Sequence, residues 1–335
     1  KAAPSNLAAV SGRTATLYGR GEDMVRLARA MGEPLQRRRF VTLTGMGGIG
    51  KTAAAMESAH WHWERDYFPD GVFFAPARGV TTHAELLIAL GRAAGIAGFD
   101  QVAPEEQEAA LLALLKERRV LLVVDNVDGV RDDKAFRAFL ERIDPSPAGR
   151  LLLTCRRRME VDGEREVVLG RLQVEPSVAL FLVGWGIEHP SREQAGEAAV
   201  ICGAGLLAGH PQAVLIASAV ARKERMVSLT SLRERLRERM AETLKDRRTA
   251  EEEVSLVSTL NISYDALGAT AREMLPRVGI YEGVFREEGA RALAGELGGW
   301  RDGLIELLEH HLLEKGEATT TTGEKVELYQ MHPVV

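Results

Sequence analysis

The sequence of 335 residues has little of several features that define specialised protein classes. It contains two cysteines, Cys155 and Cys202, which are too few for a disulfide framework and fit a reducing cytosol. It has no apolar run long enough to cross a membrane, and its first residues lack the apolar core of a signal peptide. We therefore expect a cytoplasmic protein with no membrane partner.

The sequence also lacks an excess of positive charge. Its 43 lysines and arginines are outnumbered by 48 aspartates and glutamates, which gives a net charge of -5 at pH 7. This balance provides no general attraction to nucleic acid or to an anionic membrane, although it leaves a local basic patch open. A hydrophobic content of 45% with 27% charged residues is that of an ordinary globular protein, and the length favours two or three domains.

The most informative stretch is Val41–Thr52, where an apolar strand pattern runs into G-x-x-x-x-G-K-T. Glycines let the backbone wrap closely enough for its N–H groups to point at phosphate oxygens, and the following helix adds its positive end. Lys51 is expected to reach the β- and γ-phosphates of ADP or ATP, and the Thr52 hydroxyl to ligate Mg²⁺. The predicted nucleotide-binding residues here are Gly45, Met46, Gly47, Gly48, Ile49, Gly50, Lys51, Thr52 and Ala53.

A second strand pattern supplies a candidate metal ligand. Val120–Val124 is a continuous run of valine and leucine, typical of a strand buried on both faces of a parallel sheet. It ends in Asp125, at the edge where open α/β sheets bind their ligands. An aspartate in this place is otherwise a common turn former. Together with the upstream loop, the pattern favours Asp125 and Thr52 as the residues that hold Mg²⁺.

A third strand pattern, residues 150–154, is followed by Cys155 and three arginines. A basic cluster at the same sheet edge could reach a γ-phosphate, and the alternative is a solvated loop. Arg156 lies nearest to the strand end and is the predicted contact.

Strand and helix patterns alternate from residue 40 to 170, which predicts a three-layer α/β P-loop NTPase domain with a parallel sheet. From residue 173 onward helical patterns dominate. Short helices over 254–313 are followed by a predicted hairpin of 318–322 and 325–330, and this order suggests a winged-helix domain. The predicted division is a linker at 1–15, a nucleotide-binding domain at 16–170, a helical domain at 171–250 and a winged-helix domain at 251–335.

Taken together and in order, the motifs of the chain resemble those of the NB-ARC ATPases of the STAND class. This family includes apoptosome ATPases, plant disease-resistance proteins and many bacterial signalling and defence proteins. The resemblance covers nearly the whole chain. Its motifs are Tyr18-Gly19-Arg20, the Gly45–Thr52 loop, Asp125, Thr154-Cys155-Arg156, Gly209-His210-Pro211 and Met331-His332-Pro333.

The resemblance implies a nucleotide-controlled switch with slow ATP hydrolysis. Residues 18–20 and Pro211 would lie against the adenine, Arg156 would read the γ-phosphate, and His332 would contact the β-phosphate of ADP. ADP would hold a closed monomer, and exchange for ATP would permit self-association. The resemblance also implies an effector domain before residue 1 and a sensor domain after Val335, so we expect the chain to be part of a longer protein.

Two residues depart from the family pattern. Asn126, which we include among the catalytic candidates with Lys51, Asp125 and Arg156, stands where many members carry a second acidic residue. An amide cannot accept a proton as a carboxylate does, so hydrolysis would be slow or would depend on another group such as Asp128. Pro333 replaces the aspartate of the last motif, which would weaken the ADP-bound state.

Two alternatives to the switch stay open on the sequence. A DNA-binding regulator would use the winged helix, but the candidate recognition segment 301–311 carries three acidic residues against one arginine. Phosphate contact needs the opposite balance, so a nucleic-acid partner is not expected. The other alternative, an ATPase motor of the AAA+ type, would require steady turnover, which Asn126 disfavours.

Overall fold

The computed structural model describes residues 3–10, 16–32, 39–144, 148–245, 249–250, 253–281, 283–319 and 325–331. Contacts within the chain divide it into two compact units. The first is formed mainly by residues up to Gly170, and the second mainly by residues from Arg171 onward.

The first unit is built on a five-stranded sheet with the strand order β2-β3-β4-β1-β5. All four strand pairs are parallel, as the sequence predicts. Because β1 lies beside β4 and β4 lies beside β3, the carboxyl ends of these three strands meet at one edge. The strands are β1 (Phe40–Thr44), β2 (Gly71–Pro76), β3 (Val120–Asp125), β4 (Arg150–Cys155) and β5 (Glu164–Val168).

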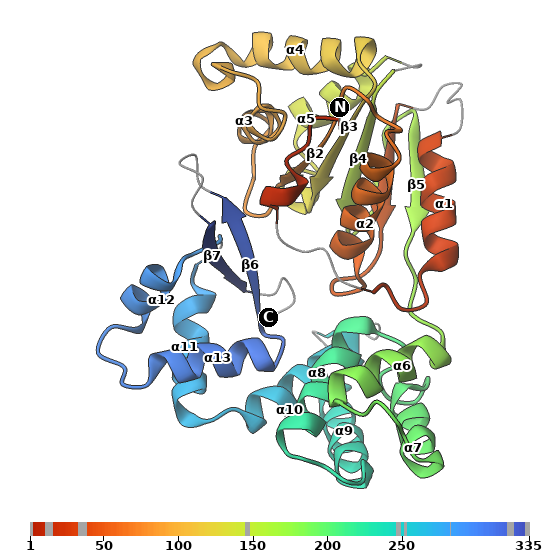
Figure 1. Ribbon diagram of the computed structural model, residues 1–335, viewed down its shortest axis with the longest axis vertical. Helices are drawn as coiled ribbons and strands as arrows, with labels where there is room; N and C mark the ends of the chain where they lie inside the picture. The colour runs from red at the N-terminus through yellow and green to blue at the C-terminus, as the bar shows by residue number, and fades with distance from the viewer. Residues whose placement is uncertain are drawn as a thin grey trace. The chain divides into compact units, whose positions relative to one another are not determined.

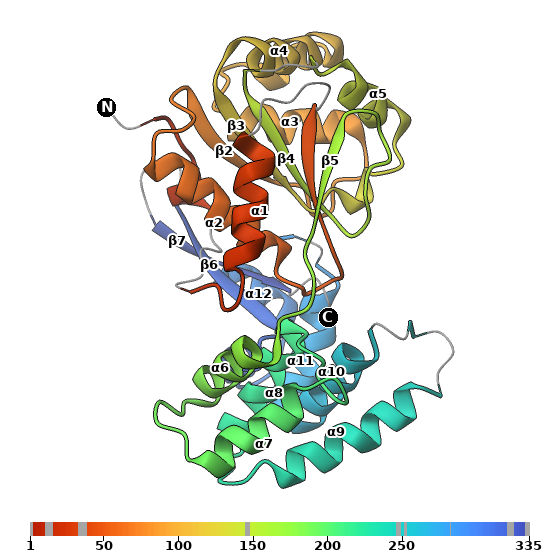
Figure 2. The same cartoon turned by 90° about the vertical axis from the view of Figure 1, so that its right-hand side faces the viewer.

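Helices cover both faces of this sheet (Figures 1 and 2). On one face lie α1 (Gly21–Gly32) and α2 (Lys51–Glu64). On the other lie α3 (His83–Ala93) and α5 (Lys134–Arg142), and α4 (Pro104–Glu117) packs on α3. The side chains of α3, α4 and α5 share one hydrophobic core with the strands. The three layers confirm the α/β P-loop NTPase fold expected from the sequence.

Short 3-10 helices and capped ends complete this unit. The 3-10 helices are η1 (Leu7–Ala9), η2 (Phe99–Gln101) and η3 (Val127–Gly129). The Asp133 carboxylate accepts hydrogen bonds from the first N–H groups of α5, which explains why that helix begins there.

The described part of the predicted linker, residues 3–10, contacts the edge strand β2. Ser5 forms a parallel bridge to Val72 of β2. The Asn6 side chain donates to the backbone oxygen of Phe74 and accepts from its N–H, both at 2.8 Å. Amide side chains carry a donor and an acceptor, so Asn6 satisfies the edge of β2 as a strand would.

The second unit consists of helices followed by a hairpin, and it contains two hydrophobic cores. No described helix in the chain is both long and apolar enough to cross a bilayer. The first core joins α6 (Val174–Trp185), α7 (Arg192–Cys202), α8 (Pro211–Lys223), α9 (Thr230–Thr243) and α10 (Val254–Ala266). The second joins α11 (Ala269–Gly279), α12 (Glu287–Ala294), α13 (Trp300–Glu309), β6 (Leu313–Thr319) and β7 (Lys325–Met331).

The order of three helices and a hairpin is that of a winged helix. The first strand of the hairpin begins at Leu313, earlier than the predicted start at 318, because Leu312 and Leu313 join the core. Residues 320–322 of the predicted strand lie outside the described residues. Phe285 forms an isolated antiparallel bridge to β7: its N–H donates to the Tyr329 oxygen at 2.9 Å, and its oxygen accepts from the Tyr329 N–H at 2.7 Å.

His310, at the end of α13, is fully buried. Its Nδ1 lies 2.9 Å from the Ser263 hydroxyl of α10. Burial lowers the pKa of this histidine to about 4, and the charge of Lys223 lowers the pKa further, while Glu306 opposes both effects. His310 is therefore a neutral part of the core near pH 7.

Candidate nucleotide-binding site

The phosphate-binding loop lies between β1 and α2, where the sequence predicts it. Gly45, Gly48 and Gly50 have φ values of 152°, 68° and 98°. Residues other than glycine rarely adopt these backbone angles, which explains the glycines at these positions. Gly50 is the N-cap of α2 and carries no side chain to cap it, so the first N–H groups of the helix can face a phosphate.

The Lys51 side chain is held in place by backbone oxygens of the phosphate-binding loop. Its Nζ donates to the Gly45 oxygen at 2.8 Å and to the Met46 oxygen at 2.9 Å. Burial lowers the pKa of Lys51, the charges of Asp128 and Asp125 oppose this, and the charge of Arg156 lowers the pKa further. The lysine thus lies within electrostatic reach of two carboxylates and one guanidinium, all from the same sheet edge.

Asp125, the last residue of β3, is the centre of a hydroxyl network. The Thr52 hydroxyl lies 3.0 Å from its Oδ1 and 2.9 Å from its Oδ2, and the Thr154 hydroxyl donates to Oδ1 at 2.6 Å. Burial raises the pKa of Asp125, while both hydroxyls and the charge of Lys51 lower it. Carboxylate and hydroxyl oxygens are ligands of the type that Mg²⁺ prefers, so Asp125 and Thr52 fit the metal expected there.

Thr154 has a second role that the sequence did not reveal. Its Oγ1 accepts a hydrogen bond from the Asn126 N–H at 2.8 Å while it donates to Asp125. Asn126 has a left-handed backbone with φ 66°, which asparagine tolerates better than most residues. One buried hydroxyl therefore fixes two predicted catalytic residues. This role depends on β3 and β4 being neighbours in the sheet, which sequence motifs do not reveal.

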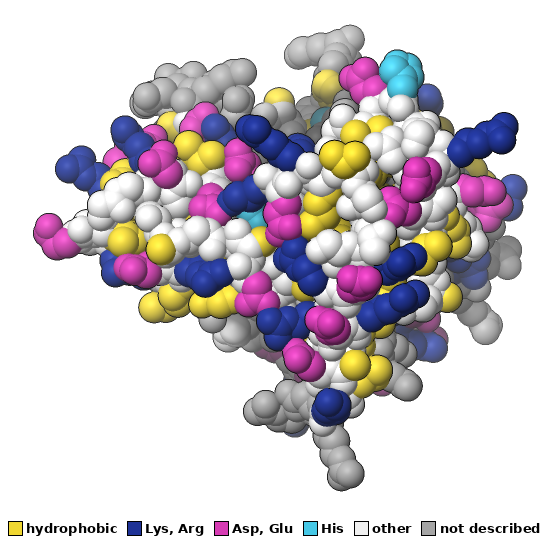
Figure 3. Space-filling model, turned by 90° about the horizontal axis from the view of Figure 1, so that it is seen from below, with side chains coloured by type: hydrophobic (Ala, Val, Ile, Leu, Met, Phe, Trp, Pro, Cys, Tyr) yellow, Lys and Arg dark blue, Asp and Glu magenta, His cyan; other side chains and the backbone are white. Residues whose placement is uncertain are grey.

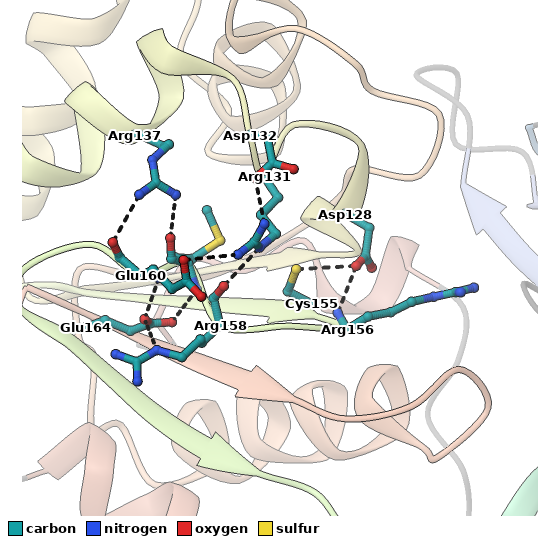
Figure 4. Close-up of polar contacts among 10 residues, drawn as sticks. Asp128, Arg131, Asp132, Arg137, Cys155, Arg156, Arg158, Glu160 and Glu164 are labelled. Carbon is teal, nitrogen blue, oxygen red and sulfur yellow. Dashed lines mark hydrogen bonds and ion pairs between the residues drawn. The ribbon is translucent and has the colours of Figure 1, made fainter. Parts of the chain in front are cut away.

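Arg156 directly follows β4 and reaches the same edge. Its backbone N–H donates to Asp128 Oδ1 at 2.8 Å, and its side chain is exposed. Figure 4 shows this side chain extending away from the polar contacts around the loop. The structure thus brings Lys51, Thr52, Asp125 and Arg156 to one edge of the sheet, and their roles toward a nucleotide stay predictions.

The predicted adenine contacts at residues 18–20 begin just before α1. The buried Arg20 side chain donates from Nη1 to the Gly170 oxygen at 2.7 Å and to Asp23 Oδ2 at 2.9 Å. These bonds fix the start of α1 to the end of the first unit. Tyr18 is half-buried, and Gly19 is exposed with φ 63°.

Pro211 is the first residue of α8, a position that suits proline because no intrahelical partner is lost. The preceding His210 is the N-cap, and its Nδ1 accepts from the Ala213 N–H at 3.4 Å. Its Nε2 lies 2.9 Å from the backbone oxygen of Gly47. Gly47 and His210 belong to the same compact unit, the second. A neutral imidazole with Nδ1 as acceptor carries its proton on Nε2, so we assign Nε2–H as the donor.

The last predicted site residue lies at the end of the chain. Met331 is a buried residue of β7. His332 and Pro333 lie outside the described residues.

Comparison with known proteins supports the P-loop NTPase fold of the first unit. A family model described as an AAA domain matches residues 34–160, which include β1, the loop and β4. A solved STAND protein with a tetratricopeptide repeat sensor, from Pyrococcus horikoshii, has a similar fold with a TM-score of 0.63. It is 16% identical, and the match covers 97% of this chain and 42% of that one.

Two curated relatives are regulatory proteins named AfsR. The protein of Streptomyces coelicolor is 34% identical over 202 residues, covering 57% of this chain and 19% of that protein. The protein of Streptomyces griseus is 30% identical over 223 residues, covering 64% and 21%. The chain thus spans about a fifth of the length of these relatives. The loop geometry, the sheet and these matches together show that the chain contains a domain with the P-loop NTPase fold.

Proposed function

We propose that this chain is the nucleotide-controlled switch of a signalling protein, of the kind found in the NB-ARC ATPases of the STAND class. The observation that carries the proposal is the network of Thr52, Asp125 and Thr154 beside Lys51. It provides two oxygen ligands for Mg²⁺ next to a lysine and a glycine-rich loop that suit the β- and γ-phosphates. ADP or ATP with Mg²⁺ is the ligand that satisfies all of these groups at once.

Two features favour a switch over a turnover enzyme. Asn126 offers an amide where a proton-accepting carboxylate would speed hydrolysis, so we expect slow cleavage of ATP. Arg156 supplies a positive charge at the same edge, which would interact with ATP more strongly than with ADP because only ATP has a γ-phosphate. A ligand shifts a conformational equilibrium only by its different affinity for two states, and Arg156 is our candidate for that difference.

The remaining steps rest on the resemblance between this chain and the family. We propose that Pro211 and residues 18–20 contact the adenine and that His332 contacts the β-phosphate of ADP. ADP then holds a closed monomer, and ATP permits self-association that activates an effector elsewhere in a longer, cytoplasmic protein. Signalling or defence is the role this implies, and the curated relatives are named as regulatory proteins.

The test is the oligomeric state in each nucleotide. The purified chain with Mg²⁺ should be monomeric in ADP and should form larger assemblies in ATPγS, as measured by size-exclusion chromatography with light scattering. Lys51→Ala is the matched control, because without the lysine the two nucleotides should give the same result. Identical profiles of the wild type in ADP and ATPγS, at saturating occupancy of both, would refute the switch.

We propose no nucleic-acid partner. The single arginine of α13, Arg301, pairs with Glu287, and Glu306 of the same helix pairs with Lys223. Basic and acidic side chains are interspersed on the face shown in Figure 3. Phosphate backbones require a basic stripe, so we expect no retention of duplex DNA in a filter-binding assay at low salt.

A further inference from the structure

The segment that follows β4, residues 155–160, is braced from two sides (Figure 4). From one side come Asp128 of η3, Arg131 just after it, and Arg137 of α5. From the other side comes Glu164, the first residue of β5. Each of these side chains bonds to backbone atoms of the segment, so residues outside the loop help to fix its shape.

The two arginines hold backbone oxygens of the loop. The buried side chain of Arg131 donates from Nε to the Arg158 oxygen at 2.9 Å. Arg137 donates to the Met159 oxygen at 2.6 Å and to the Glu160 oxygen at 3.0 Å. Three successive carbonyl groups are therefore fixed by charged donors, which form stronger hydrogen bonds than neutral ones.

Glu164 holds two N–H groups of the same loop. Its Oε1 accepts from the Met159 N–H at 2.7 Å, and its Oε2 accepts from the Glu160 N–H at 3.0 Å. At the far end of the loop, residues 159 and 160, both the backbone N–H groups and the backbone oxygens are therefore hydrogen-bonded. The near end, where Arg156 lies, depends on Asp128.

Asp128 binds the near end through a single oxygen. Its Oδ1 accepts from the Arg156 N–H at 2.8 Å and from the Cys155 thiol at 3.3 Å. Burial, together with the charge of Asp128, raises the pKa of that thiol to about 11, so it keeps its proton and donates. The carboxylate is thereby committed to two donors of the loop.

This geometry bears on how Arg156 meets a nucleotide. The Arg156 backbone is bonded to Asp128, and Figure 4 shows the guanidinium extending away from the braced contacts. A long side chain keeps its direction only if its backbone is fixed, because freedom of the backbone adds to that of the rotamers.

We propose that Asp128 is a positioning residue that fixes the backbone of Arg156 so that its guanidinium meets the γ-phosphate, and that Asp128 is not the base for hydrolysis. This inference rests on the proposed nucleotide function. It differs from the sequence-based expectation that hydrolysis could depend on Asp128 in place of the acid missing at Asn126. The role requires an acceptor oxygen at Asp128 and does not require its charge.

The experiment compares the affinities of the chain for ATPγS and ADP, both with Mg²⁺, by isothermal titration calorimetry. Arg156→Ala should reduce the preference for ATPγS by about tenfold to a hundredfold, the range for one hydrogen bond to a charged group. Asp128→Ala should cause a loss of the same order, and the double variant should lose no more than Arg156→Ala alone.

Asp128→Asn separates positioning from catalysis. The amide keeps an acceptor oxygen for the Arg156 N–H, so the preference for ATPγS and the slow hydrolysis rate should stay within about threefold of wild type. If Asp128 were the base for hydrolysis, this variant would lose it, and the hydrolysis rate would fall. Asp132→Asn is the matched control: this exposed carboxylate pairs with Arg131, whereas the Arg156 N–H bonds to Asp128. Arg131 can keep its bond to the Arg158 oxygen, so the loss of the Asp132 charge should change neither value.

The outcomes separate the positioning role of Asp128 from the proposed γ-phosphate contact of Arg156. If Arg156→Ala leaves the preference unchanged, the proposed γ-phosphate contact is wrong. If Arg156→Ala lowers it and Asp128→Ala does not, or if Asp128→Asn is as impaired as Asp128→Ala, the positioning role is wrong. Asp128→Ser, whose hydroxyl is too short to reach the Arg156 N–H, replaces Asp128→Ala if that variant does not fold.

Discussion

Replacing Thr154 by valine tests the network at the centre of the site. Valine has nearly the same shape as threonine but has no hydroxyl, so the substitution removes two hydrogen bonds without opening a cavity. Asp125 loses the donor that lies 2.6 Å from its Oδ1, and the Asn126 N–H loses its acceptor at 2.8 Å. Thr154 is buried, so water does not readily replace either partner.

The expected loss of stability follows from these two groups. A buried polar group left without its partner costs about 1–3 kcal/mol. The Asn126 N–H loses its acceptor, whereas Asp125 keeps the Thr52 hydroxyl, which places the cost for Asp125 at the low end of this range. The sum for the two groups is therefore about 2–4 kcal/mol. At roughly 2–4 °C per kcal/mol, the unfolding midpoint should fall by on the order of 10 °C.

Thr154→Ser is the matched control, because serine keeps the hydroxyl and loses one methyl group, worth about 1 kcal/mol. Differential scanning calorimetry of both variants, without added nucleotide, measures the difference. Thr154→Val should unfold well below Thr154→Ser. If the two variants unfold at the same temperature, the Thr154 hydroxyl does not stabilise the site through Asp125 and Asn126, and the prediction is wrong.

Three further predictions concern other parts of the chain. His310 has a pKa of about 4 when folded, against an ordinary 6.5, so its contribution to stability is complete above about pH 6.5 and is lost as the pH falls toward 4. Between about pH 7.5 and 5.5 the wild type should lose roughly 1 kcal/mol more than His310→Gln in denaturant titrations, and equal losses would contradict this. Gly209→Ala should cost more than about 2 kcal/mol, because φ is 69° and a Cβ would lie 2.0 Å from the Leu172 oxygen. Gly205→Ala, where an added Cβ meets nothing within 4 Å, should leave the stability nearly unchanged. Differential scanning calorimetry of both glycine variants measures the difference. Finally, EDTA should weaken ATPγS binding by the wild type more than by Asp125→Asn, and an equal effect on both would remove Asp125 as the Mg²⁺ ligand.

The parallel sheet and the phosphate loop could be predicted because their physical causes are local. The glycines of the loop adopt angles that other residues avoid, and the apolar run 120–124 can only be buried on both faces. Asp125 was placed at the ligand edge by the same reasoning, since a strand end in a parallel sheet has one possible location.

The contacts that position the site could not be predicted in this way. Asp128 reaches Arg156 and Thr154 reaches Asp125 only because β3 and β4 are neighbours, which is a property of the strand order. The same limit explains Asn6, whose side chain completes the edge of β2 from a stretch without periodicity. Contacts between residues far apart in sequence carry no local pattern.

Whether the chain carries a nucleotide when it is purified tests the central claim most directly. The protein would be denatured before any nucleotide is added, and the released compound identified and quantified by chromatography. We predict ADP at close to one equivalent per chain. An empty site, or one that exchanges freely and turns ATP over steadily, would contradict the switch and favour an ATPase motor.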